Sequence, residues 1–240
     1  MALQSSGPIS LSQIQAEFGG SNPISLSEYY RNGPYTTSNN TGVPTSGTID
    51  LGDFYGTVAA NTINYEIIGG GGEGAGGYYN TGNGNAGGSS SLSSASGTSF
   101  TTITSSGGSG GIQPAPYNGS YRVSQNGFAS YYGPGGQGGY NSNSDNQTAG
   151  FPAPSSSYGA GGGGGGAYPF SANNGGGGGG AATRLTGTLL LAPGSVITVT
   201  IGAGGSGNPG GGDGAKGYCQ LLVNNTAYTF TSSGSFTVPA

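Results

Sequence analysis

The sequence has no histidine, no tryptophan, one cysteine and few charged residues among its 240 positions. Without histidine there is no Ser-His-Asp or Cys-His arrangement for nucleophilic catalysis, and no imidazole ligand for a metal ion. The single cysteine, Cys219, cannot close an intrachain disulfide and says little about the redox compartment. These absences predict a protein that is not an enzyme and that holds no metal ion and no cofactor.

Basic residues are scarce, and the formal net charge is −4. Such a chain has no electrostatic footprint for nucleic acid. The first residues lack the basic and apolar regions of a signal peptide, and apolar runs such as residues 189–192 are too short to cross a membrane. We therefore expect no nucleic-acid partner, no membrane insertion and no signal peptide. The four basic residues are Arg31, Arg122, Arg184 and Lys216.

One enzymatic alternative needs no histidine, because a glycan-cleaving site can work with two carboxylates. Outside residues 1–57 the acids are Glu66, Glu73, Asp145 and Asp213. Glu66 and Glu73 are near each other in sequence, but nothing in the sequence marks them as buried or paired. Two carboxylates meeting in a cleft would revive this alternative.

Glycine is what the sequence has in abundance, with 57 residues, and two uninterrupted glycine runs span 161–166 and 175–180. A glycine run loses much conformational entropy on folding and buries no side chain. Its one advantage is close backbone approach, which lets left-handed helices of three residues per turn pack side by side and bond laterally. The runs are therefore expected to form packed polyglycine helices or a glycine-lined sheet core.

Residues 1–57 contain a threefold echo, at 9–14, 24–29 and 49–54, and each copy predicts the start of a short helix. Ser10, Ser25 and Asp50 are suitable N-caps. Gln13 and Glu28 complete capping boxes, and Asp53 gives a shorter version. Each copy is followed by glycine or, in the second copy, by an Asn-Gly pair, and these residues are expected to end the helices. Two interpretations stay open: three helix starts of a small core, or a compact adaptor.

Residues 8–56 resemble the N-terminal module of tailed-phage virion proteins, among them tail-fibre proteins, through "ISLSQIQAEFGGSNPISLSEYYRNG" and "VPTSGTIDLGDFYG". The resemblance implies a virion component, assembled in the host cytoplasm, that contacts other virion proteins through residues 1–57. It leaves the position in the virion open. The residues expected to serve attachment are Ile9, Leu11, Phe18, Ile24, Leu26, Tyr29, Tyr30, Leu51 and Phe54.

The rest of the chain shows the alternation and the turn residues that are typical of β-strands. Strands are predicted within 58–68, 99–104, 184–191, 195–201, 218–223 and 227–231, with turns at Pro193-Gly194 and Asn224-Asn225. The motif Gly69-x-Gly71-x-x-Gly74 follows a strand but cannot open the helix that a dinucleotide site requires. We predict a mainly β chain: a module of short helices at 1–57, then a glycine-rich, β-sandwich-like domain at 58–240 with long loops at about 75–182.

The stretches "INYEIIGGGGEG", "LLAPGSVITVTIGAGGSG" and "YTFTSSGSFTVPA" look like the glycine-rich β domain of phage fibres and bacterial surface proteins. The glycine runs are similar to those of T-even-like phage adhesins, which stack polyglycine helices and display variable loops. In these relatives the segment like 233–240 comes before the strand like 62–68. The reversed order here predicts a circular permutation, with Val238 and Ile63 as neighbours in one β layer, and Pro239 at a strand end or edge.

Tyrosines between glycine-, serine- and asparagine-rich stretches suit an adaptable contact surface, as in antibody paratopes. The predicted partner is a host surface glycan or an outer-membrane protein. Two alternatives remain: the tyrosines pack back onto the glycine surface, or the protein is a structural virion component without receptor contact. Low apolar content predicts a homo-oligomer, with a trimer favoured. The expected receptor-binding residues are Tyr121, Tyr131, Tyr132, Tyr140, Tyr158 and Tyr168.

Overall fold

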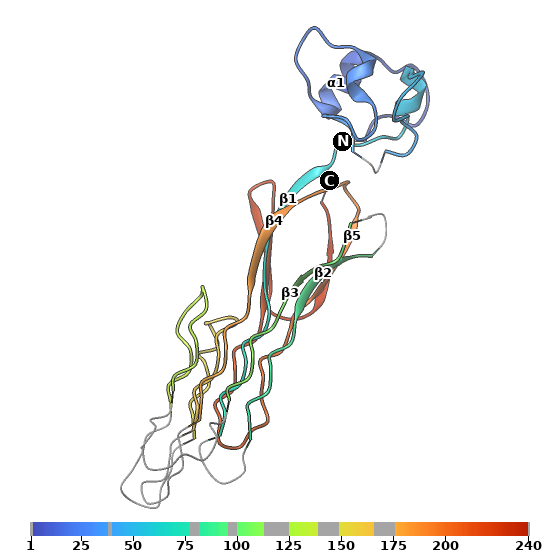
Figure 1. Ribbon diagram of the computed structural model, residues 1–240. Coiled ribbons are helices and arrows are strands. Elements are labelled where there is room, and N and C mark those ends of the chain that lie inside the picture. Colours follow the sequence, from blue (N-terminus) through green and yellow to red (C-terminus); the bar gives the residue numbers. More distant parts are fainter. Residues whose placement is uncertain are drawn as a thin grey trace, which may run out of the picture.

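The computed structural model describes residues 2–37, 40–76, 82–95, 100–112, 125–138, 149–165 and 176–239. As predicted, the chain is mainly β, with two antiparallel sheets and few short helices. Figure 1 shows the helices gathered at one end of the molecule, the two sheets next to them, and glycine-rich segments extending away from the sheets at the other end.

The N-terminal helices begin at the expected caps. Helix α1 (Leu11–Phe18) and the 3-10 helix η2 (Leu51–Phe54) both have complete capping boxes, at Ser10 and Asp50 respectively. The 3-10 helix η1 (Leu26–Tyr29) begins after Ser25, but the Ser25 side chain makes no capping hydrogen bond. Its hydroxyl instead lies 2.6 Å from that of Ser27. The capping box expected at Ser25 is therefore wrong.

The helices enclose a small aromatic core. Tyr29 and Phe54 are fully buried, with ring centroids 6.3 Å apart in an edge-on arrangement, and Phe18 lies 6.2 Å from Phe54. The Tyr29 hydroxyl donates to the carbonyl of Gly19 at 2.7 Å, so its buried polar end is satisfied. This core draws only on residues between Leu3 and Ala59.

In the part of the chain that the structure describes, eight strands form two four-stranded antiparallel sheets. The first sheet has the order β4-β1-β6-β7 and the second the order β3-β2-β5-β8. The first sheet consists of β1 (Asn61–Ile68), β4 (Arg184–Leu191), β6 (Tyr218–Val223) and β7 (Thr226–Phe230). The second consists of β2 (Ser90–Ser94), β3 (Ile103–Ser105), β5 (Val196–Thr200) and β8 (Gly234–Thr237).

One hydrophobic core takes residues from both sheets. Ile63, Ile67 and Leu221 from the first sheet cluster with Leu92 and Ile197 from the second, and all five are fully buried. Alternation along the strands produces this core, because residues two apart point to the same face. Tyr65 and Leu189 pack against the cluster from the first sheet.

The predicted neighbours at the two ends of the domain do meet, but in different sheets. The Asn61 side-chain amide donates to the carbonyl of Pro239 at 2.8 Å, and Ile63 and Val238 share the core. β8 pairs with β5 in the second sheet, whereas β1 lies in the first. The expectation of one β layer is therefore wrong: the two segments face each other across the core. Strand β8 is an edge strand that ends before Pro239, as expected.

Beyond the sheets, nine segments of the described residues, most of them rich in glycine, lie side by side; we call them the glycine bundle. Residues 69–76 are its first central segment, and every one of them is buried. The N–H groups of Gly70, Gly71 and Gly72 donate in turn to three different segments, and those of residues 73–75 repeat the same three partners. The bundle comprises residues 69–76, 82–88, 105–112, 125–138, 149–153, 159–165, 176–182, 201–205 and 210–217.

The first central segment is enclosed on all sides. It donates to 82–88, 210–217 and 176–182, and it accepts from 105–112, 201–205 and 159–165. Neighbours in this ring are also bonded to one another, as Gly88 is to Ala203 and Gly214 is to Gly205. The segment 159–165 is a second centre with its own ring, which adds 149–153 and the two arms of 125–138. Backbone bonds, rather than side chains, therefore connect the bundle.

The two sheets continue directly into the bundle. β1 runs into 69–76, β3 into 105–112 and β5 into 201–205, while 82–88, 176–182 and 210–217 lead into β2, β4 and β6. Two fully buried serines bridge the sheets where this change occurs. The Ser90 hydroxyl donates to the carbonyl of Ile68 at 2.7 Å, and the Ser105 hydroxyl donates to the carbonyl of Thr183.

Candidate functional site

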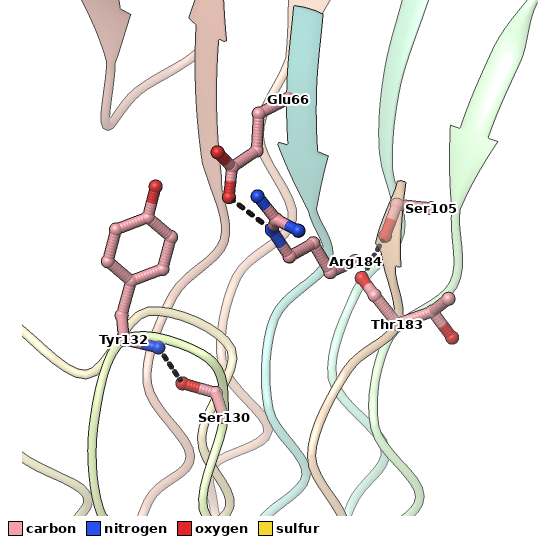
Figure 2. Close-up of polar contacts among 6 residues, drawn as sticks. All are labelled: Glu66, Ser105, Ser130, Tyr132, Thr183 and Arg184. Atoms are coloured by element: carbon pink, nitrogen blue, oxygen red, sulfur yellow. Dashed lines mark hydrogen bonds and ion pairs between the residues drawn. The ribbon is translucent and has the colours of Figure 1, made fainter. Parts of the chain in front are cut away.

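A group of aromatic and charged side chains lies where the first sheet meets the glycine bundle. The tip of segment 125–138 brings it together, because a bridge between Ser130 and Gly133 reverses the chain there. The Ser130 hydroxyl accepts a hydrogen bond from the N–H of Tyr132 at 3.2 Å and steadies the turn (Figure 2). Tyr131 and Tyr132 are thereby held beside β1 and β4.

Four tyrosines pack together at this point, and we call them the tyrosine cluster: Tyr131, Tyr132, Tyr158 and Tyr218. The rings of Tyr158 and Tyr218 stack with centroids 4.8 Å apart, and Tyr132 lies 4.9 Å from Tyr218. Tyr131 meets Tyr132 edge-on at 5.4 Å. Tyr218 is buried, whereas Tyr131 is 70% exposed. The cluster therefore presents one open ring on a fixed aromatic base.

An ion pair lies against this cluster. The Arg184 Nε is 2.6 Å from the Glu66 Oε1 (Figure 2). The Arg184 guanidinium also sits 4.0 Å from the centre of the Tyr131 ring. The side chain of Glu66 is 15% exposed and that of Arg184 is 37% exposed. The hydrogen bond that Arg184 donates to the Glu66 carboxylate raises the pKa of Arg184. The pair leaves this part of the surface without a net charge.

The hydroxyl of Tyr132 is kept protonated. Burial raises its pKa above the ordinary tyrosine value, and hydrogen bonding to Tyr218 and the charge of Glu66 raise it further. Figure 2 shows the Tyr132 ring pointing toward the Glu66 carboxylate. A neutral phenol in this position can donate a hydrogen bond at any physiological pH.

Next to the ion pair, the outward face of the first sheet is hollowed into an open groove of about 380 Å³. Register places Asn64 beside Thr188 and Leu222, and Glu66 beside Thr186 and Gln220. The Thr188 hydroxyl donates to the Asn64 side-chain oxygen at 2.9 Å. The groove is therefore lined by hydroxyl, amide and carboxylate groups together with the apolar surfaces of Tyr65 and Leu222.

The predicted receptor-binding tyrosines divide into two sets. The structure brings Tyr131, Tyr132 and Tyr158 together, with Tyr132 and Tyr158 half-buried. These rings pack on one another and on Tyr218, and of the three only Tyr131 is widely exposed. Tyr121, Tyr140 and Tyr168 lie outside the described residues.

Sequence reasoning missed Tyr218, which we assigned only to a strand. The alternation of β6 offered a signal, because Tyr218, Gln220 and Leu222 must share the face opposite Cys219 and Leu221. The sequence also did not reveal the pairing of Glu66 with Arg184. The two residues are 118 positions apart, so the register of β1 against β4 must be known before they can be paired.

Most residues predicted to attach the N-terminal module lie in its interior. Ile9, Phe18, Tyr29 and Phe54 belong to the buried core, while Leu11, Ile24, Leu26 and Leu51 pack against it half-buried. The Tyr30 hydroxyl donates to the carbonyl of Gly47. These side chains hold the module together, and attachment through this module stays a prediction.

The two acids that nothing in the sequence marked as buried or paired, Glu66 and Glu73, both have partners in the structure. Glu66 forms the ion pair described above, and Glu73 is fully buried inside the glycine bundle. Its carboxylate accepts from the backbone N–H and the side-chain amide of Asn85, at 3.0 and 3.1 Å, and from the N–H of Asn208. Both carboxylates thus have partners that explain their positions.

Comparisons with protein-family models, with curated protein sequences and with solved structures found no match for this chain. Within the described ranges, no three metal-ligating side chains come together, and no helix is long and apolar enough to cross a bilayer. The geometry itself defines a rigid aromatic and polar surface, which is suited to binding.

Proposed function

We propose that the glycine bundle is a set of packed polyglycine II helices that extends a two-sheet β-sandwich. Polyglycine II has three residues per turn and no internal hydrogen bonds. The return of each N–H donation to the same neighbour at every third residue of 69–76 supports this assignment. So does the burial of segments that carry almost no side chains.

On this scaffold, we propose a non-enzymatic protein of the bacteriophage virion, a tail-fibre or adhesin subunit that binds the host cell surface through aromatic loops. The resemblance of residues 8–56 to phage virion modules supports the virion assignment. Residues 1–57 would contact other virion proteins. The complete particle would hold several copies, with a trimer favoured.

One observation carries the adhesin proposal: the bundle holds close together the ends of several segments that adjoin stretches predicted from the sequence to be loops. Ala75 bonds to Gly177, Gly165 bonds to Ala75, and Gln125 bonds to Gly176. These described segment ends therefore lie in one small region, on a base made of lateral backbone bonds. Binding loops are most effective when such a rigid scaffold positions them.

A purely structural role in the virion remains a second candidate, as a decoration, joining or fibre-anchoring component. The packing of Tyr132 and Tyr158 within the chain favours it, since those rings are used internally. In this role the aromatic residues would stabilise the protein without contacting a receptor.

A cell-binding experiment separates the two candidates. Fluorescently labelled full-length protein is incubated with host bacteria, and its ability to delay infection by the intact phage is measured. Saturable binding together with competition is expected for the adhesin. Incorporation into particles with neither binding nor competition would overturn it in favour of the structural role.

A further inference from the structure

The outward face of the first sheet carries a second candidate site, separate from the loops that connect the bundle segments. Three strands contribute to it, and their register aligns polar side chains across the sheet. Asn64 and Glu66 project from β1, Thr186 and Thr188 from β4, and Gln220 from β6. Adjacent positions on a sheet lie close enough for one small ligand to touch several of them.

The chemistry of this groove indicates what it can bind. Asn64 and Thr186 are exposed, and Gln220 is half-exposed. Amides and hydroxyls both donate and accept hydrogen bonds. Sugar hydroxyls do the same, so each can pair with groups of this kind. Leu222 adds an apolar patch on which the C–H face of a sugar ring can rest.

Charge and shape narrow the choice further. Arg184 neutralises Glu66 at one end of the groove, so an acidic ligand finds no unpaired cation there. The Arg184 guanidinium is also covered by the Tyr131 ring, whose centre lies 4.0 Å away. We propose that this groove binds a neutral saccharide, with Asn64 and Gln220 as its hydrogen-bonding residues and Leu222 as its apolar contact surface. The biological role of the groove rests on the proposed host-binding function, because a surface glycan is its natural source.

Saturation-transfer NMR on the full-length protein tests this directly. The probes are neutral tetrasaccharides of glucose, galactose and mannose, with a uronate-containing tetrasaccharide as the charged comparison. At least one neutral probe is expected to bind, with a dissociation constant on the order of 1 mM. Each of Asn64→Ala and Gln220→Ala is expected to weaken that binding about two- to tenfold, as for the loss of one hydrogen bond. Thr198→Val, an exposed threonine on the second sheet, is the matched control and leaves it unchanged.

Three outcomes overturn the proposal: no binding of any neutral probe, equal binding of the uronate probe, or equal loss of binding in the Thr198→Val control. The cell-binding experiment separates this result from the proposed function. Host binding without saccharide binding removes the groove and leaves the adhesin. Saccharide binding without host binding keeps the groove and removes the adhesin. Melting curves of each variant verify that a loss of binding does not come from unfolding.

Discussion

Strand β1 and the segment that follows it show two ways of stabilising the same continuous chain. Within the sheet, β1 has two bonded neighbours, β4 and β6, and it buries the side chains of Ile63 and Ile67. Directly after β1, segment 69–76 bonds to six neighbouring segments and has only the side chains of Glu73 and Ala75 to bury. A strand uses its two faces for side chains, whereas a glycine segment uses every direction for backbone bonds.

This comparison indicates why the glycine content is so high. At Gly71 an added Cβ would lie 1.9 Å from the carbonyl oxygen of Ala160, and at Gly70 it would lie 1.9 Å from that of Ala203. Such distances leave no room for any side chain, because the colliding atoms are backbone. The bundle thus gives up hydrophobic burial in return for close lateral contact.

The largest effect is expected from a cavity in the sheet core. Ile67→Ala removes a fully buried side chain between the two sheets and should cost about 2–5 kcal/mol of unfolding free energy. Urea denaturation followed by circular dichroism measures it. Thr62→Ala, at an exposed position of the same strand, serves as the control. A cost below about 1 kcal/mol would show that the sheets contribute little to the stability of the fold.

A methyl group in the bundle is expected to have the next largest effect. In Gly163→Ala the new Cβ would lie 1.9 Å from the carbonyl oxygen of Gln137, so segments must separate, at a cost of about 3 kcal/mol. Gly234→Ala is the matched control, because an added Cβ there meets nothing within 4 Å. Equal melting temperatures for the two variants would contradict close packing around segment 159–165.

Glu73 tests a fully buried acidic side chain of the bundle. Glu73→Gln replaces a carboxylate oxygen by an NH₂ group that faces N–H donors, so we expect a loss of about 1–3 kcal/mol. Asp213→Asn changes an exposed acid of the same bundle and is expected to stay within about 0.5 kcal/mol of the unsubstituted protein. If the two substitutions cost the same, the buried hydrogen bonds of Glu73 do not stabilise the bundle.

The smallest effect is expected for Cys219, whose reactivity toward an alkylating reagent reports whether the sheet core opens. Burial, and then the charge of Glu66, raise the pKa of its thiol to about 12. Because the folded-state pKa is raised, this contribution to stability is complete below pH 9 and is lost as the pH rises toward about 12. Alkylation at pH 8, followed by mass spectrometry, should therefore be negligible without denaturant. Rapid labelling of the folded protein would indicate that the first sheet opens independently of the bundle.

Side-chain patterns predicted those parts of the fold that side chains determine. The caps at Ser10 and Asp50 and most strands follow from residue type and alternation. Strand β2 was missed because its sequence, Ser-Ser-Leu-Ser-Ser, has one apolar residue and no visible alternation. The predicted close approach of glycine segments needs only their lack of Cβ atoms.

The neighbours of each glycine segment could not be predicted in the same way. A run such as 161–165 has no side chain to distinguish one register from another, so its partners depend on the entire folded chain. The site shows the same limitation. Glu73 meets Asn208 across 135 residues, and Glu66 meets Arg184 across 118. Only the sheet and bundle topology, which the sequence alone does not specify, brings these pairs together.

The direct continuation of strands into the bundle has a mechanical consequence. The N-terminal helices lie at one end of the molecule and the bundle extends from the other end of the sheets (Figure 1). A pulling force along this axis runs parallel to the strands and across the lateral hydrogen bonds of the bundle. Many such bonds then resist sliding at the same time, instead of breaking one after another as they would under peeling. A load along this axis is therefore opposed by many lateral bonds acting together.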